Sequence, residues 1–558
     1  MSVLHLLYLL HQVEAVSQFS SSGSLPMDLF SLQSILLLFL ASLYFYFFFF
    51  FFSSSGKKLA GADGRGGGIK NYPILGSLPE FFMNRSRFLD WTTGVLASSP
   101  NNTLLFVRPG GSNGIITANP VNVEHILKTR FDNYPKGETF IAILDDFLGK
   151  GIFNSDGELW RIQRKTASYE FNSRSLRNFI MENVTVELRS RLVPILEAAA
   201  GSCRTLNLQD IFERFAFDNV CKLAFNFDPG CLAGDGTGRN EFMLAFEEAA
   251  KLSYDRFMYL FPSMQKIKKL LNVGSERRLR NAIATVHRFA EDIIRSRIEN
   301  RRMRMEEKAS GRQEEADLLS RFFDIENISA EFLRDIVISF ILAGRDTTSS
   351  ALTWFFWLLS RSPAVEERIL EELGAVRARN GKLAGDNLYS FEELREMQYL
   401  QAAILEAMRL HPPVPVDTKD CLMDDVLPDG HVIKRGWFIT YNTYAMGRME
   451  SIWGKDFGEF KPERWLDSDR GGGRTAMVCR QESPFKYPVF HAGPRICLGK
   501  DMAYIQIKSI VAAVLTRFRV DVLNRNSRPE EVLSLTLRMK GGLPVRVKPR
   551  SAAGDERD

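Results

Sequence analysis

The sequence around Cys497 places five residues at fixed spacing in a loop that is rich in glycine. Residues 490–499 read FHAGPRICLG, so Phe490, Gly493, Arg495 and Gly499 surround Cys497 in the pattern FxxGxRxCxG. Glycine lets the backbone come close to the sulfur atom, and backbone N–H groups that point at sulfur stabilise a negative charge on it. Apolar periodicity after this loop predicts a helix, whose N-terminus adds a partial positive charge. Such a loop would hold the cysteine as a thiolate.

The remaining cysteines fit a simpler role, because a free cysteine is most often a small buried hydrophobic residue. They are Cys203, Cys221, Cys231, Cys421 and Cys479. Six cysteines in 558 residues are too few for a disulfide framework. None has the C-x-x-C spacing of a zinc ribbon or a thioredoxin-like motif.

The FxxGxRxCxG spacing resembles the haem-binding loop of the cytochrome P450 superfamily. The resemblance implies that Cys497 is the axial ligand of haem iron, with haem b as the cofactor and O₂ as the co-substrate. It also implies that Phe490, Gly493 and Gly499 shape the haem-binding loop and that Arg495 binds a haem propionate. The resemblance extends over residues 72–550 and implies a mainly α-helical fold with small β-sheets.

A second motif of this superfamily is WxxxR. Trp160 and Arg164 lie one helical turn apart and therefore share a face, which suits two donors to one carboxylate. The resemblance implies that both bind a haem propionate. On its own the pattern is weak, since an arginine on a solvated surface is the common alternative.

Residues 343–348 (AGRDTT) interrupt a long apolar helix that we predict over residues 331–361. Gly344 weakens a helix by about 1 kcal/mol relative to alanine, a cost that makes sense if the helix backbone approaches a bound O₂. The segment resembles the oxygen-activation motif, which implies that Ala343 and Gly344 lie beside O₂. The resemblance also implies that the Thr347 hydroxyl relays protons and that Asp346 supplies them. The alternative is an ordinary helix kink with an exposed aspartate.

Glu406 and Arg409 form an ExxR pattern with opposite charges on one helix face, which alone is a common surface ion pair. The segment PERW at residues 462–465 follows and resembles the partner segment of the superfamily. The resemblance implies a buried structural triad of Glu406, Arg409 and Arg464. Loss of one partner would leave a buried charge unpaired, at a cost of about 3–5 kcal/mol.

These motifs require a large domain to position them, and we predict one over residues 72–550 followed by a tail at 551–558. Residues 121–410 have mostly helical periodicity, and the last third mixes short strands with turns. Residues 110–114 match GxSxG, the nucleophile motif of some hydrolases, which needs a strand before it and a helix after it. Because a β-like stretch follows instead, we predict a hairpin turn here.

Residues 29–52 form an uncharged apolar stretch. As a helix it would span about 36 Å, enough to cross a hydrocarbon layer of roughly 30 Å. No Lys or Arg precedes Lys57. The positive-inside rule therefore predicts a luminal segment at 1–28, a single transmembrane anchor, a linker at 53–71 and a cytoplasmic catalytic domain. The resemblance implies contact with membrane lipid of the endoplasmic reticulum, and we expect Met27 to be the true start.

The net charge of +5 is small for this length and argues against a nucleic-acid partner. The sequence contains neither GxGxxG nor a P-loop, so we do not expect it to bind NADPH itself. The resemblance implies that electrons come from NADPH through the membrane-bound NADPH–cytochrome P450 reductase. Four basic residues near the motifs would steer an acidic partner, although a solvated charged surface is the alternative. They are Arg161, Lys165, Lys486 and Lys500.

Longer segments at 412–419, 424–430, 444–450 and 452–454 resemble a plant branch of the superfamily. That branch includes fatty-acid ω-hydroxylases and enzymes that ω-oxidise the hormone jasmonoyl-isoleucine. Both substrates are small amphipathic carboxylates. We expect ω-hydroxylation of fatty acids, with ω-oxidation of jasmonoyl-isoleucine as the alternative, and the sequence does not specify oxidation beyond the alcohol.

The substrate requires an apolar channel and a cation for its carboxylate, and the sequence does not identify that cation. A haem-binding protein without turnover is a third possibility, but it would have no need of the Asp346–Thr347 pair. We expect the channel to be formed by Phe340, Ile341, Val414, Val416 and Leu535.

Overall fold

The computed structural model describes residues 42–43, 69–73, 75–108, 113–171, 174–234, 240–259, 262–306, 318–323, 325, 328–381, 388–469 and 476–550. The expected luminal segment and tail lie outside the described residues, as do nearly all of the anchor and most of the linker. Within the described residues, no helix is both long and apolar enough to span a membrane. The chain from Gly66 onward forms one unit.

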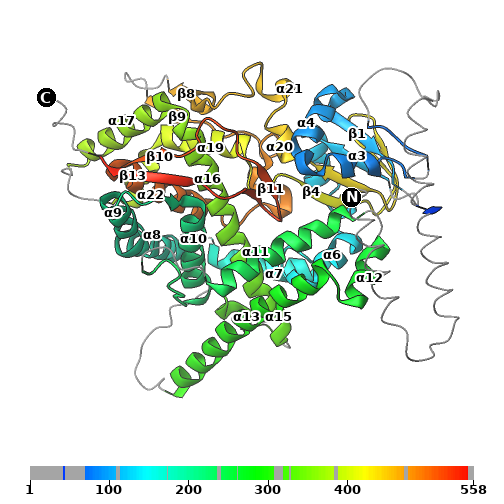
Figure 1. The fold of residues 1–558 in the computed structure, drawn as a ribbon, viewed down its shortest axis with the longest axis horizontal. Coiled ribbons are helices and arrows are strands. Elements are labelled where there is room, and N and C mark those ends of the chain that lie inside the picture. The colour runs from blue at the N-terminus through cyan, green and yellow to red at the C-terminus, as the bar shows by residue number, and fades with distance from the viewer. Residues whose placement is uncertain are drawn as a thin grey trace, which may run out of the picture. The chain divides into compact units, whose positions relative to one another are not determined.

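Helices dominate the described chain, and the prediction of a mainly helical fold with small sheets is confirmed (Figure 1). The α-helices are α3 (Leu78–Met83), α4 (Phe88–Ser98), α5 (Pro120–Glu124), α6 (Glu138–Leu148), α7 (Gly157–Phe171), α8 (Arg174–Glu187), α9 (Val193–Gly201), α10 (Leu208–Phe225), α11 (Glu241–Asp255), α12 (Pro262–Leu271), α13 (Ser275–Glu306), α14 (Ser320–Phe323), α15 (Ala330–Ile341), α16 (Thr347–Ser360), α17 (Pro363–Arg379), α18 (Phe391–Glu396), α19 (Gln398–Leu410), α20 (Thr443–Met446), α21 (Glu450–Trp453) and α22 (Lys500–Arg517). Short 3₁₀ or π turns lie between them: η2 (Arg85–Arg87), η3 (Pro100–Asn102), η5 (His125–Thr129), η6 (Phe131–Asn133), η7 (Leu188–Leu192), η8 (Arg256–Met258), η10 (Leu342–Asp346), η11 (Pro462–Trp465), η12 (Pro488–Phe490) and η13 (Gly493–Arg495).

The strands form one four-stranded sheet and several smaller ones. The strands are β1 (Thr103–Phe106), β2 (Gly114–Thr117), β3 (Leu206–Asn207), β4 (Asp417–Asp420), β5 (Asp425–Val426), β6 (Val432–Ile433), β7 (Phe438–Tyr441), β8 (Leu466–Asp469), β9 (Ala476–Cys479), β10 (Phe518–Val522), β11 (Glu531–Leu533), β12 (Leu537–Met539) and β13 (Pro544–Pro549). The largest sheet has the order β1-β2-β7-β4. Its β1 and β2 are antiparallel, with Thr103 opposite Thr117, as expected for a hairpin rather than a nucleophile elbow.

A long helix crosses the fold from Ala330 to Ser360, as the apolar periodicity predicted. It begins at Ser329, whose side chain accepts a hydrogen bond from the Phe332 N–H (3.1 Å). A turn of π-helix, η10, separates its two halves, α15 and α16. Such turns widen a helix locally and often occur at functional sites. The interruption coincides with the AGRDTT segment.

Gly344, inside this π turn, allows a close approach of another helix. A Cβ atom at Gly344 would lie 2.5 Å from Cγ2 of Val220 on α10. The structure therefore explains the presence of glycine at position 344 by the packing of Val220, and not by the expected approach of the helix backbone to O₂. Its missing side chain admits α10, and this packing fixes the π turn against the core.

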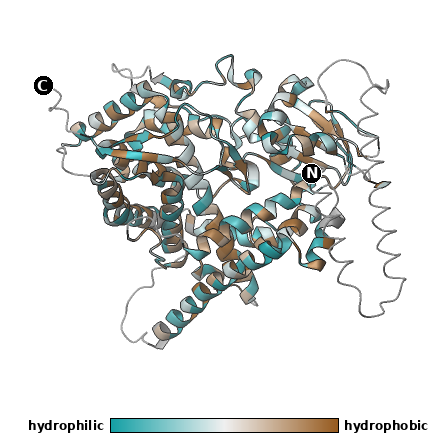
Figure 2. Cartoon of the chain, in the orientation of Figure 1, coloured by the Kyte–Doolittle hydropathy of each residue, from teal (hydrophilic) through white to brown (hydrophobic). Residues whose placement is uncertain are grey.

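The core consists of apolar residues on helix faces that pack against one another. Figure 2 shows that α13 is mostly hydrophilic where it extends beyond the rest of the fold. Around α10, the rings of Phe217, Phe242 and Phe289 pack together, with centroids 5.0 Å apart for the first pair and 4.1 Å for the second. Such pairs add about 0.5–1.5 kcal/mol beyond burial alone. The long helix thus has a rigid support on this side.

Gly344→Ala tests the contact between the π turn and α10. Overpacking typically costs about 1–3 kcal/mol, and better helix propensity returns about 1 kcal/mol. We expect a lower free energy of unfolding, measured by denaturant titration. In a Val220→Gly background the same substitution should cost less, because both Val220 atoms that clash with the new Cβ, Cγ2 at 2.5 Å and Cβ at 2.7 Å, are gone. Equal costs in both backgrounds would contradict the packing explanation.

Candidate active site

The cysteine loop packs tightly against a neighbouring turn. The Cys497 N–H donates to the carbonyl of Phe490 (2.8 Å), which closes the loop. Gly493 has a φ of +63°, and a Cβ there would lie 1.9 Å from the carbonyl oxygen of Leu127 in η5. Glycine is needed for both reasons, since other residues rarely adopt this φ. The first glycine of the motif is therefore fixed by contacts within the protein.

The Cys497 thiol lies deep in the fold, yet its side chain is exposed because open space adjoins it. Burial raises the pKa of the thiol, whereas the Gly499 N–H and the charges of Arg164 and Lys500 lower it. A Cβ at Gly499 would lie 4.0 Å from Cys497 Sγ and 3.7 Å from the Phe171 ring. These are ordinary van der Waals distances, so the structure does not require glycine at this position. The exposed side chain of Cys497 is what fits a large planar group such as haem.

Arg164 on α7 lies near the Cys497 thiol. It is half-buried, and its guanidinium makes no hydrogen bond or ion pair with any residue that the structure describes. Burial lowers the pKa of Arg164, and the nearby Cys497 thiol opposes this effect. A half-buried arginine beside the thiol fits an anionic ligand group, and a haem propionate has the required charge and geometry.

Arg495 and Trp160, the other predicted propionate residues, contact each other. The Arg495 guanidinium lies 4.4 Å from the centroid of the Trp160 ring. Its Nη2 also donates to Asp156 Oδ1 (2.6 Å) and to the Ser155 carbonyl (3.0 Å). The stacking holds the guanidinium plane in place. The sequence motifs placed both residues at the site but did not predict that one would support the other.

A buried charge cluster centres on Asp417. Lys136 Nζ lies 2.5 Å and Lys419 Nζ 2.9 Å from its carboxylate oxygens, and the Tyr441 hydroxyl donates to it (2.9 Å). Although burial raises the pKa of Asp417, the two lysines hold it well below its usual range. Burial lowers the pKa of Lys419 to about 7 and that of His491 to about 4. Sequence analysis missed this cluster, for which the only local signal was the position of His491 inside the motif.

Ala343 and Thr347 face the cavity from the long helix. The Thr347 hydroxyl donates to the carbonyl of Ala343 (2.6 Å) across the π turn. A hydroxyl donates one hydrogen bond and accepts two. Thr347 therefore holds its proton at the cavity wall and still has acceptor capacity toward the cavity.

Asp346 points away from the cavity into a chain of ion pairs. It is only 9% exposed, so the alternative of an exposed aspartate is wrong. Arg345 lies 3.1 Å from Asp346 and 3.5 Å from Glu213. Arg538 joins Glu213 (2.6 Å) to Glu247 (2.9 Å), whose side chain is 39% exposed. The chain of charges therefore connects Asp346 with the protein surface.

Glu406, Arg409 and Arg464 meet in the core, where Glu406 and Arg409 are fully buried. Two nitrogen atoms of Arg409 lie 2.7 and 2.8 Å from the two oxygens of Glu406, a bidentate pair. Arg464 Nε lies 3.2 Å from Glu406 Oε1. The Trp465 indole N–H donates to the other oxygen (2.8 Å). The three residues occupy a structural position away from the cavity lining.

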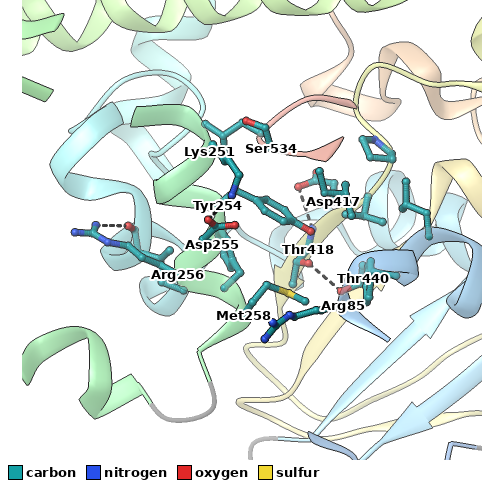
Figure 3. Close-up of a pocket in the computed structure, with 18 of the residues that line it drawn as sticks. Arg85, Lys251, Tyr254, Asp255, Arg256, Met258, Asp417, Thr418, Thr440 and Ser534 are labelled. Carbon is teal, nitrogen blue, oxygen red and sulfur yellow. Dashed lines mark hydrogen bonds and ion pairs between the residues drawn. The ribbon is translucent and has the colours of Figure 1, made fainter. Parts of the chain in front are cut away.

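A cavity of about 1550 Å³ extends from Ala343 and Thr347 to the four-stranded sheet. Figure 3 shows Tyr254 and Met258, from the α11 side, extending toward Thr418 and Thr440 of β4 and β7. The two threonine hydroxyls hydrogen-bond to each other (2.8 Å). The strands therefore offer a polar patch to a cavity whose wall is mainly apolar and aromatic.

Three of the five expected channel residues line this cavity: Val414, Val416 and Leu535. Phe340 and Ile341 do not. They pack into the core, where the Phe340 ring lies 6.0 Å from that of Phe322. The π turn places the next residues of the helix, Leu342 and Ala343, at the cavity wall instead. The expectation for Phe340 and Ile341 is corrected accordingly.

The family of the chain follows from comparison with known proteins. The family model described as Cytochrome P450 matches residues 68–543. The chain belongs to the cytochrome P450 family, which confirms the resemblance of its motifs. It is therefore a monooxygenase of the oxidoreductase class, and the family implies haem as the cofactor and O₂ as the co-substrate.

Several plant proteins are similar to the chain over most of their length. Cytochrome P450 CYP94D108 of Paris polyphylla is 52% identical over 86% of this chain and 92% of its own length. Cytochrome P450 94B1 of Arabidopsis thaliana is 48% identical over 86% and 91%. Cytochrome P450 94A1 of Vicia sativa is 46% identical over 87% and 91%. The expected resemblance to a plant branch of the superfamily is thus confirmed by these relatives.

The buried Glu213 predicts a pH dependence of stability. Burial raises the pKa of Glu213 to about 7, compared with about 4.3 for a solvated glutamate. Between these values the folded protein binds a proton that the unfolded chain does not. The free energy of unfolding should therefore fall as pH rises through this range. Glu213→Gln should lack this contribution when urea unfolding is measured from about pH 5 to about pH 8.

Glu248→Gln is the control, because Glu248 pairs with Arg278 outside the ion-pair chain of Glu213, and it should keep the pH dependence of the wild type. If Glu213→Gln shows the same pH dependence as the wild type, Glu213 is not the titrating group.

Proposed function

We propose that the protein hydroxylates the terminal carbon of fatty acids. The cavity of about 1550 Å³, lined by Ala343 and Thr347 and by apolar and aromatic residues, carries the proposal. Its volume exceeds the roughly 300–1000 Å³ of ordinary small-molecule sites, so it accommodates a long alkyl chain. A methyl terminus offers no polar group for recognition. An apolar wall must therefore position it end-on toward the reacting group.

In this proposal haem b occupies the space beside the Cys497 thiol. Cys497 is the axial ligand, and Arg164 binds a propionate with Trp160 and Arg495. The loop residues that shape the site are Phe490, Gly493 and Gly499. The exposed Cys497 side chain and the Arg164 guanidinium, which has no ion pair or hydrogen bond within the described chain, support this assignment. When bound, the haem would accept the electrons and activate O₂.

Thr347 and Asp346 hold and supply protons in this proposal. The Thr347 hydroxyl carries a proton at the cavity wall. Burial raises the pKa of Asp346, which favours its protonated form. The ion pair with Arg345, which also pairs with Glu213, holds the Asp346 carboxyl group in place. Because arginine stays protonated, Arg345 positions Asp346 and does not itself relay protons. General acid groups of this kind work best when their pKa lies near the operating pH.

The second candidate function is ω-oxidation of jasmonoyl-isoleucine. Lys136, Thr418 and Thr440 add polar groups to the cavity lining, and these can hydrogen-bond an amide. Both candidates share a terminal C–H bond and a carboxylate. The same reaction can oxidise the alcohol product further to an aldehyde or acid. Analysis of the products distinguishes these outcomes.

We further propose that electrons come from NADPH through a membrane-bound reductase that docks near α7. Arg161 and Lys165 are exposed there, whereas Lys486 and Lys500 are half-buried. Exposed cations speed the encounter with an acidic partner. The apolar segment at 29–52 would anchor the protein in the endoplasmic reticulum membrane as a single-pass protein, with residues 72–550 on the cytoplasmic side.

Cys497→Ala tests the ligand assignment. Without the sulfur, the reduced protein should lose the thiolate-type absorption band of its CO complex, because that band depends on the axial thiolate. Cys203→Ser changes another exposed cysteine and should keep the band. Persistence of the band in Cys497→Ala would overturn the assignment.

Expression with a plant reductase and NADPH tests the substrate class. Lauric acid and oleic acid should give terminal alcohols, detected by mass spectrometry, with one oxygen atom from ¹⁸O₂. Jasmonoyl-isoleucine should be converted more slowly at equal concentration. A faster conversion of the conjugate would favour the second candidate, and no NADPH-dependent product from any substrate would contradict both.

A further inference from the structure

The cations around the cavity are mostly neutralised by the protein. Ion pairs join Lys136 to Asp417, Lys251 to Asp255, Arg256 to Glu276, Arg528 to Asp90 and Lys540 to Glu530. Arg85 and Lys266 are exposed, and Arg87 is exposed and donates to Asn84. A lining cation that is already paired or fully hydrated contributes little to binding an anion.

Arg108 differs from these cations. It lines the cavity and is half-buried, but its guanidinium forms no ion pair or hydrogen bond within the described part of the chain. The Phe438 ring, 5.5 Å from Cζ, covers one side. Burial lowers the pKa of Arg108, and no carboxylate offsets this effect. A partly desolvated charge without a partner is costly, and an anionic ligand would remove that cost.

The backbone that leads into Arg108 is held in place. The Val107 carbonyl accepts from the Ser77 N–H (2.8 Å), and the Val107 N–H donates to Ser77 Oγ (3.1 Å). The Arg108 N–H donates to Asn113 Oδ1 (3.2 Å). Gly76, at a φ of +57°, permits this approach, since its Cβ would lie 2.3 Å from the Val107 oxygen. The guanidinium is thus attached to a fixed point, which lowers the entropy cost of binding.

An aromatic surface adjoins Arg108 on the cavity side. The Phe81 ring lies 5.3 Å from that of Phe106 and 6.1 Å from that of Phe88, and all three line the cavity. The cavity continues from there to Thr347. Figure 1 shows that β1, which ends next to Arg108, lies well apart from α16, which begins at Thr347. A ligand that spans the cavity would need a charged end and a long apolar body.

We propose that Arg108 binds the carboxylate of the substrate and thereby sets which carbon reaches the Thr347 end of the cavity. The inference rests on the proposed function, because it assigns the cation that a fatty-acid substrate requires. The guanidinium forms a bidentate pair with the carboxylate. The alkyl chain runs along the aromatic surface toward Ala343 and Thr347. Arg108 is a specificity-determining residue and takes no part in the oxygen chemistry.

The test compares laurate with its methyl ester in the wild-type holoenzyme and in Arg108→Gln. Binding is measured from the shift of the haem Soret band, and turnover from terminal-alcohol product. The wild type should bind laurate more tightly than the ester. Arg108→Gln should weaken laurate binding by at least about tenfold and leave ester binding unchanged. It should also spread hydroxylation over carbons before the terminal one, because the carboxylate no longer fixes the chain.

Three further variants make the result specific. Arg108→Lys keeps the charge but not the fork and should recover part of the laurate affinity. Arg85→Gln removes an exposed arginine that stacks on Phe82 (4.5 Å) and should change laurate binding less than twofold. Lys268 is the other half-buried cation of the lining that has no ion pair in the described chain, and its Nζ lies 4.5 Å from the centroid of the Tyr259 ring. Lys268→Gln removes this cation. The thiolate-type CO band checks that each variant is folded.

The outcomes separate the two proposals. If the wild type oxidises laurate but Arg108→Gln binds laurate as tightly as the wild type, the assignment of Arg108 is overturned and the proposed function stands. The same holds if Lys268→Gln, and not Arg108→Gln, abolishes the preference for the acid over the ester. If the wild type neither binds nor oxidises laurate, the proposed function fails and the role of Arg108 in it fails as well.

Discussion

The carboxylate of Glu406 is fully buried, and an ionised group at such a position is tolerated only when every oxygen is hydrogen-bonded. Arg409, Arg464 and Trp465 supply side-chain donors, and the Lys461 N–H adds one more. Arg409 reaches further, to the carbonyls of Gly447, Phe457 and Glu459. One ion pair thus joins α19 to the long segment that precedes the cysteine loop, so the position of the thiol depends on it.

Three charge systems surround the site, and in each of them the charged side chains pair with one another. They centre on Glu406 in the core, on Asp417 beside the sheet and on Glu213 behind the long helix. Because these groups neutralise one another locally, two half-buried arginines of the described chain remain without a counter-charge close to the site. Arg164 faces the space beside the thiol, and Arg108 faces the cavity. The arrangement of paired charges therefore determines where anions can bind.

Local spacing was sufficient to predict much of this site, because the cysteine loop, the ExxR pair and the AGRDTT helix are short patterns within single elements. It was harder to predict which residues of the long helix face the cavity. The π turn shifts the cavity wall from Phe340 and Ile341 to Leu342 and Ala343. Long-range pairs left no sequence signal, since Glu213 and Arg538 are 325 residues apart. The apolar segment at 29–52 stays a prediction.

The hydrogen bond from Thr347 to Ala343 has a consequence for the timing of proton release. A hydroxyl has a single proton, and in this conformation it is committed to a helix carbonyl at 2.6 Å. An acceptor in the cavity obtains that proton only by out-competing the carbonyl, which water does less readily than an anion does. The Ala343 carbonyl therefore holds the Thr347 hydroxyl proton until a stronger acceptor competes for it. The Thr347 proton stays on this hydrogen bond while only water fills the cavity. It becomes available when a negatively charged acceptor binds there.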